Sequence, residues 1–330
     1  MSWKAWCGLT LLWGSLLALC WPLIAADVRS DSDADLTVSV VRKGFTNSIG
    51  MRFVPVRAGT FVMGSPTDEK EREPHGKGSE EQHEVKITKD FYLGVYEVTQ
   101  KQYRDIMGYN PSHFSADANP APKGTYSSDK PGGGKDKVKG LDTDDFPVEN
   151  VSWDDAQEFC TKLNALAAER KYRVSYRLPT EAQWEYACRG GHLIKDRKMA
   201  QLPFHFREPS ASLGFGQANF GGIFPYGGGK AGKSLRRTNT VGRNGEANPL
   251  GLSDMHGNVM EWCSDWYDPE YFARSRRLDP TGYESGSQRV LRGGDWDCRG
   301  EDCRAARRLC DTPSRRCYYF GFRVVAALQN

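Results

Sequence analysis

The stretch NPLGLSDMHGNVMEWCSDW, residues 248–266, shows the character of the C-terminal half of this chain. Glycine, asparagine and tryptophan become frequent after Gly191, and apolar residues no longer recur with the period of a helix or a strand. Such a region has to be held by aromatic packing, turn chemistry and bound ions rather than by long regular elements. We therefore expect an α+β fold with a few short helices, short strands and long ordered loops.

Regular elements are expected upstream. Residues 51–56 and 60–65 alternate apolar and polar side chains and predict short strands. Three helices are predicted from capping boxes, in which a hydroxyl residue and a polar residue three positions later exchange hydrogen bonds: Thr99 with Gln102, Ser152 with Asp155, and Thr180 with Gln183. Cys160 falls on the apolar face of the second helix and is expected in the core. The segments 68–84 and 123–139 are expected as solvated surface loops.

Composition excludes several functional classes. The chain has 330 residues, 38% hydrophobic and 26% charged, with a formal net charge of +3, which is too small to favour nucleic acid or a membrane surface as partner. Residues 227–234, GGGKAGKS, match a phosphate-binding loop, but no buried strand precedes them and no helix pattern follows. We expect no nucleotide site there.

The N-terminus predicts export. An apolar run over 9–25 follows Lys4 and closes on small residues before Asp27, which is typical of a cleaved signal peptide. A retained membrane anchor and a lipidated Cys20 are the alternatives. We divide the chain into a signal peptide (1–26), a linker (27–48) and one domain (49–330), and expect a periplasmic or extracellular location.

Seven cysteines remain after removal of the signal peptide, an odd number that leaves at least one outside intramolecular disulfides. Cys298 and Cys303 lie five residues apart among arginines, in RVLRGGDWDCRGEDCRAARR (289–308). Neighbouring guanidinium groups favour the thiolate, so this pair is a candidate soft-metal or redox site. A disulfide framework, with Cys298 bonded to Cys303 and Cys310 to Cys317, is the alternative.

Several blocks carry a family resemblance. In order along the chain they are GTFVMGS (59–65), YEVTQ (96–100), PVENVSW (147–153), RLPTEAQWEYA (177–187), the stretch 248–266, RGGDW (292–296) and GFRV (321–324). Together they resemble the sulfatase-modifying factor family, whose namesake is formylglycine-generating enzyme, over about residues 50–327.

The resemblance implies an irregular fold related to C-type lectins and an oxidoreductase activity. Formylglycine-generating enzymes oxidise a cysteine of a sulfatase peptide to an aldehyde with copper(I) and oxygen. Aligned on residues 293–296, the copper ligands and catalytic residues fall on Cys298 and Cys303, with an arginine-rich rim around the peptide. Aligned on residues 304–307, Cys303 instead falls where relatives without known oxidase activity also carry a cysteine.

Residues 254–261 resemble a calcium loop of the same family. The resemblance implies the side chains of Asp254 and Glu261 and the carbonyls of Gly257 and Val259 as ligands of a structural calcium ion. Calcium needs about six to eight oxygen ligands, and two carboxylates around a glycine suit it. Asn219 resembles part of a second calcium site, but no matching aspartate lies near Ser234.

Two other functional readings stay open. One is a non-catalytic module that binds a protein or glycan while disulfides staple the C-terminus; the other, sulfoxide synthesis, lacks an accompanying iron-binding histidine domain. No histidine pair has zinc-ligand spacing and no nucleophile elbow is present. We expect core packing, rather than a sugar pocket, for the tryptophans at 153, 184, 262, 266 and 296.

Overall fold

The computed structural model describes residues 43–73, 80–119 and 130–329. The predicted signal peptide and most of the predicted linker lie outside these residues. Among the residues described, no helix is both long enough and apolar enough to cross a membrane.

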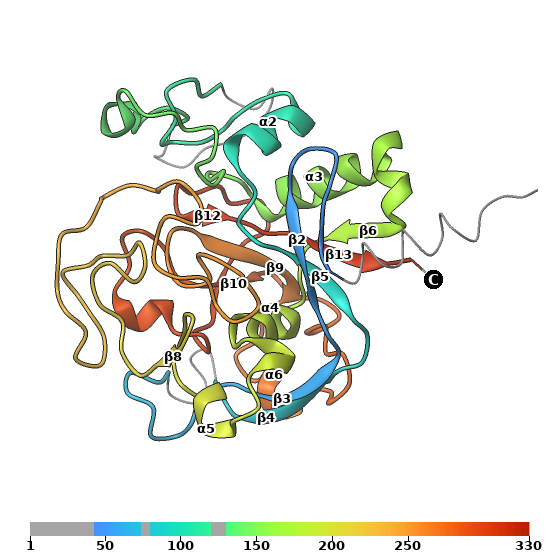
Figure 1. The fold of residues 1–330 in the computed structure, drawn as a ribbon, viewed down its shortest axis with the longest axis vertical. Coiled ribbons are helices and arrows are strands. Elements are labelled where there is room, and N and C mark those ends of the chain that lie inside the picture. Colours follow the sequence, from blue (N-terminus) through green and yellow to red (C-terminus); the bar gives the residue numbers. More distant parts are fainter. Residues whose placement is uncertain (1–42, 74–79, 120–129, 330) are drawn as a thin grey trace, which may run out of the picture.

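A five-stranded antiparallel sheet joins the two ends of the domain (Figure 1). Its strands, in spatial order, are β1 (Phe45–Thr46), β2 (Arg52–Val56), β5 (Phe91–Gly94), β13 (Val325–Leu328) and β6 (Val174–Arg177). Phe45 stacks on Phe53 and on Tyr172, with ring centroids 4.9 and 5.0 Å apart. The packed domain therefore includes residues just before the predicted boundary at 49.

All three predicted capping boxes are present. They begin α2 (Gln100–Met107), α3 (Trp153–Ala165) and α4 (Glu181–Cys188), each with the two reciprocal hydrogen bonds expected from its sequence. On α3 the buried face consists of Asp155, Ala156, Phe159, Cys160 and Leu163. Cys160 is therefore a core residue, as predicted.

A second sheet leads to the cysteine pair. Its order is β11 (Leu309–Asp311), β10 (Arg289–Arg292), β9 (Met260–Trp266) and β12 (Phe320–Gly321), and β12 runs parallel to β9. In Figure 1, α4 lies beside β9 and β10. Trp184 and Trp262 are fully buried and Trp296 nearly so, whereas Trp153 and Trp266 hold the Arg289 guanidinium between their rings. Core packing is thus confirmed for three tryptophans.

The remaining elements are short. They are the hairpin β3 (Gly59–Met63) and β4 (His83–Ile87), the pair β7 (Phe204–His205) and β8 (Pro209–Ser210), the helices α5 (Arg197–Ala200) and α6 (Tyr271–Arg274), and the 3₁₀ turns η1 (Lys135–Val138), η2 (Ala167–Tyr172), η3 (Gly191–Leu193) and η4 (Gly300–Cys303). Residues 211–259, all of them described, contain no helix or strand. This confirms the irregular α+β fold, and neither a strand nor a helix flanks residues 227–234.

The charged segment 68–84 is not simply solvated, which corrects the sequence-based expectation. Within its described residues, Glu80 is fully buried and the Glu69 side chain is only 5% exposed. Both carboxylates accept hydrogen bonds from Arg304, more than 220 positions away in the chain. Composition counts the charges of a segment but does not reveal a partner that distant.

Candidate functional site

Cys298 and Cys303 lie side by side. Their sulfur atoms are 3.3 Å apart, a non-bonded contact, since a disulfide would bring them to about 2.05 Å. Cys298 is half-buried and Cys303 is buried. The structure therefore brings both predicted copper ligands together.

Local chemistry explains the closeness of the two sulfurs. After β10 ends at Arg292, Gly294 has a φ of +73°, and a Cβ there would lie 2.7 Å from the Cys303 sulfur and 3.0 Å from the Cys298 sulfur. The Asp295 carboxylate accepts hydrogen bonds from the backbone N–H groups of Asp297 and Cys298, at 2.8 and 3.0 Å. This turn, followed by η4, returns the chain so that Cys303 faces Cys298.

The arginines of this stretch do not lower the pKa of the Cys298 thiol. Arg292, fully buried, forms ion pairs of 2.8 and 2.6 Å with Glu181 and Glu185, and Arg304 pairs with Glu69 and Glu80. Burial, and then the hydrogen bond with Cys303, raises the pKa of the Cys298 thiol well above its ordinary value.

The expected arginine-rich rim is therefore wrong for these residues. Arg308 also pairs with Glu181, and Arg307 with Glu73 and Asp302. Opposite charges elsewhere in the chain compensate most of the positive charge that the sequence places around the cysteines.

His256 is a site residue that the sequence analysis missed. Its Nδ1 lies 2.7 Å from the carbonyl oxygen of Cys303, and its Nε2 accepts the backbone N–H of His205 at 2.8 Å. Burial lowers the pKa of His256 to about 4, so the ring is neutral and Nδ1 carries the proton that it donates to Cys303. A fixed imidazole thus holds the backbone of one cysteine. The segment DMHGN (254–258) contains this histidine, but nothing in its sequence indicates that the ring contacts Cys303.

The disulfide alternative is not realised in residues 298–317, all of which the structure describes. Cys298, Cys303 and Cys310 are free thiols, and the Cys310 thiol donates to Gln288 Oε1 at 3.4 Å. Cys317 is buried in the main core. Neither bond of the expected framework is formed.

The predicted calcium residues lie in one buried region with partners of their own. Asp254 accepts hydrogen bonds from the Gly242 N–H at 2.5 Å and the Asn244 amide at 3.1 Å. Glu261 accepts two hydrogen bonds from Arg323, at 2.6 and 2.7 Å, and one from Trp184 at 2.8 Å. Within the described part of the chain, no three His, Cys, Asp or Glu side chains form a metal-ligand group. A cation here would therefore need backbone carbonyls as well.

Asn219 lies against the same loop. Its carbonyl accepts the N–H of Asn258 at 2.7 Å, and a Cβ on Gly257 would come within 2.3 Å of that oxygen. Gly257, with a φ of +86°, has to be glycine on both grounds. Val259 is fully buried.

Glu97 is a second residue that the sequence analysis missed. It is 1% exposed, its Oε1 accepts from the Asn258 amide at 3.1 Å, and its Oε2 has no hydrogen-bond partner among the described residues. Burial, and then the charge of Asp254, raises its pKa, while burial raises the pKa of Asp254 to about 6. Three carboxyl groups therefore share one nearby guanidinium, that of Arg323, and a bound cation would favour their charged forms.

The chain is similar to known proteins in both sequence and fold. Formylglycine-generating enzyme of Streptomyces coelicolor is 33% identical over 198 residues, which cover 59% of this chain and 56% of that protein. The bovine enzyme is 28% identical over 313 residues, covering 83% and 74%. The structure of PvdO from Pseudomonas aeruginosa superposes with a TM-score of 0.61 at 26% identity, covering 87% of this chain and 98% of that one.

The chain spans little more than half the length of the Streptomyces relative. The family model described as the sulfatase-modifying factor enzyme 1-like domain matches residues 43–328, nearly all of the described structure. The protein therefore belongs to the sulfatase-modifying factor enzyme 1-like family.

Proposed function

We propose that this protein oxidises a cysteine of a sulfatase peptide to formylglycine, with copper(I) and oxygen as cofactor and oxidant. The observation that carries the proposal is the 3.3 Å contact between the Cys298 and Cys303 sulfurs. It favours the alignment on residues 293–296, in which both cysteines take the ligand positions. The relatives named formylglycine-generating enzyme support the same reaction class.

The residues present suit copper(I). A soft ion prefers thiolates, and Cys298 and Cys303 would hold it; when bound, it supplies the activation of oxygen. Gly294 leaves the space that the two sulfurs need, and Asp295 and His256 hold the backbone on either side of the pair. Because the Cys298 pKa is raised, binding has to release a proton from this thiol, so we expect copper affinity to increase with pH.

The test is a titration with copper(I) against a chromophoric competitor, combined with mass spectrometry of a sulfatase peptide. We expect one copper per chain and aldehyde formation, with both lost in Cys298→Ser and in Cys303→Ser. Cys310→Ser is the matched control, because this half-buried free thiol donates to Gln288 and lies outside the pair. Unchanged copper affinity and aldehyde yield in Cys298→Ser would refute the proposal and favour a non-catalytic binding module.

We further propose a structural calcium ion held by the Asp254 and Glu261 side chains and the carbonyls of Gly257 and Val259, with Glu97 adding negative charge. The orphaned Glu97 oxygen supports it. We also propose export to the periplasm or the extracellular space, on the basis of the apolar run at 9–25.

A further inference from the structure

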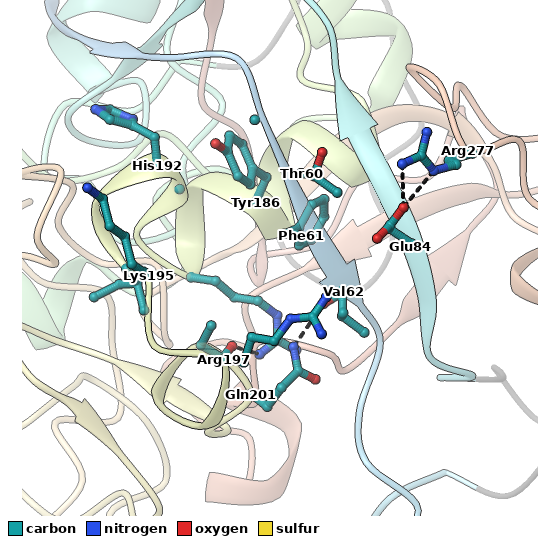
Figure 2. A pocket seen from close by; sticks show the side chains of 15 residues that line it. Thr60, Phe61, Val62, Glu84, Tyr186, His192, Lys195, Arg197, Gln201 and Arg277 are labelled. Carbon is teal, nitrogen blue, oxygen red and sulfur yellow. Dashed lines mark hydrogen bonds and ion pairs between the residues drawn. The ribbon is translucent and has the colours of Figure 1, made fainter.

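A pocket of about 630 Å³ lies between β3, the segment 191–201 and Arg277 (Figure 2). Its walls include Thr60, Phe61, Tyr186 and Lys195, and none of its lining residues belongs to the cysteine loop. It is large enough for a small ligand or a short piece of peptide. The pocket is therefore a second candidate site, separate from the one described above.

One wall of this pocket is the open edge of a strand. β3 pairs with β4 alone, in a two-stranded sheet. The side chains of successive strand residues point to opposite faces, so a pocket on one face would be lined by every second residue. Four consecutive residues, 59–62, line this pocket, which places it along the edge of β3. The Gln201 amide, itself part of the lining, donates to the Val62 carbonyl at 3.0 Å. A backbone acceptor of β3 thus faces the pocket and already receives the kind of hydrogen bond that an added strand would supply.

The side chains around this edge are mainly cationic. Figure 2 shows Lys195 and His192 at one end, Arg277 with Glu84 at the other, and Arg197 beside the strand. No described residue forms an ion pair or a side-chain hydrogen bond with Lys195 or Arg197, and both are exposed. Burial, and then the charge of Arg57, lowers the pKa of His192. Its Nδ1 accepts the Arg57 N–H at 3.2 Å, which leaves Nε2–H as a neutral donor.

A buried arginine with its own partner lies behind the pocket. Arg189, which lines the pocket and is 2% exposed, pairs with Glu185 at 2.8 Å. This buried guanidinium is therefore already neutralised, and the positive charge available to an anion in the pocket comes from the unpaired, exposed Lys195 and Arg197.

We propose that this pocket binds an extended acidic segment of a partner protein, which pairs as a strand with the open edge of β3. The edge supplies main-chain hydrogen bonds, as in other complexes in which a peptide extends a sheet. Lys195 and Arg197 select acidic side chains, and the rings of Phe61 and Tyr186 contact apolar ones. A free inorganic anion or an anionic sugar would use the charges but not the strand edge. The proposal does not depend on copper chemistry.

The test is fluorescence anisotropy of the full chain with a labelled peptide of alternating aspartate and valine. We expect Lys195→Glu and Arg197→Glu each to raise the Kd about tenfold and to reduce its salt dependence. Lys198→Glu is the matched control, because it makes the same charge change on the exposed neighbouring residue that does not line the pocket. Copper binding by the cysteine pair should be unchanged in all three variants.

Peptide variants test the strand itself. Alternate N–H groups of a strand point to opposite edges, so only every second N–H of the bound peptide can donate to β3. N-methylation of one set of alternate peptide residues, odd- or even-numbered, should therefore abolish binding, and N-methylation of the other set should be tolerated. The proposal is overturned if Lys198→Glu weakens binding as much as Arg197→Glu, or if both methylated peptides bind like the parent. It is also overturned if a sulfated oligosaccharide, and not the acidic peptide, shows the dependence on Lys195 and Arg197.

Discussion

At the scale of single residues, the site depends on one glycine. Gly294 has no side chain to separate the sulfurs of Cys298 and Cys303, and its positive φ disfavours any other residue. The sequence showed a Gly-Gly pair before the cysteines but not that the second glycine lies under both thiols.

We predict that Gly294→Ala weakens copper(I) binding and lowers the free energy of unfolding by about 1–3 kcal/mol, because the new methyl group would lie within contact distance of both sulfurs. Gly228→Ala is the control, since Gly228 has a φ of +86° but no atom within 4 Å of its added Cβ. The Gly228→Ala variant therefore has the same backbone strain but no contact between the new methyl group and other atoms. Equal copper affinity of the two variants would show that Gly294 does not set the spacing of the thiols.

The sequence predicted the pairing of Cys298 with Cys303 better than it predicted their environment. The five-residue spacing and the flanking blocks identified Cys298 and Cys303, whose sulfurs do meet. The expected activation of Cys298 by arginine was wrong, because carboxylates from α4 and from the segment before β4 pair with Arg292 and Arg304. Nothing local to residues 289–308 encodes those partners.

At the scale of elements, local signals were reliable. The three capping boxes were predicted because both partners of each lie within four residues, so tertiary structure is not needed to identify them. How the elements join was not predictable. Asp265 on β9 accepts the N–H of Glu181, the first residue of α4, at 3.0 Å and so connects that helix to the sheet beside the cysteine loop.

This junction should make stability depend on pH. Burial, and then the charge of Glu181, raises the pKa of Asp265 from 3.8 to about 7. The folded protein therefore holds this proton more tightly than the unfolded chain does. Ionisation of Asp265 therefore lowers the free energy of unfolding as pH rises from about 4 to about 7, by up to about 1.4 kcal/mol per pH unit.

We predict that Asp265→Asn, which keeps an acceptor oxygen but cannot ionise, gains stability relative to the parent protein as pH rises through this range. Urea unfolding at several pH values measures the difference. Asp268→Asn is the control, because it removes a carboxylate that is nearby but less buried. A difference between parent and Asp265→Asn that stays constant with pH would contradict the assigned pKa.

At the scale of the whole molecule, long-range charge pairs and buried carboxylates replace regular structure. Arg323, two residues before β13, pairs with Glu261 on β9, while Arg304 connects η4 to residues 69 and 80. Composition and ordered blocks predicted an irregular α+β domain, but no sequence pattern indicated that Glu97 would lie near Asp254. These carboxylates come from distant segments, and only the folded chain concentrates their charge.

Calcium should therefore stabilise the folded chain as a whole. A cation that binds only the folded state stabilises it by RT ln(1 + c/Kd), where c is the free cation concentration, so we predict a Tm that keeps increasing with calcium concentration and falls again with a chelator. Magnesium should have a smaller effect, because it releases its water ligands reluctantly. The carboxylates of Glu97, Asp254 and Glu261 would lose part of their mutual repulsion on binding.

Asp254→Asn should abolish the calcium-dependent shift in Tm. Asp279→Asn is the matched control, since Asp279 also has a positive φ, 41° against 56° for Asp254, and also accepts a backbone N–H, but from Thr88 and outside the loop 254–261. An equal calcium shift in both variants would place the ion elsewhere, and no shift in the parent protein would mean that Arg323 alone compensates these carboxylates.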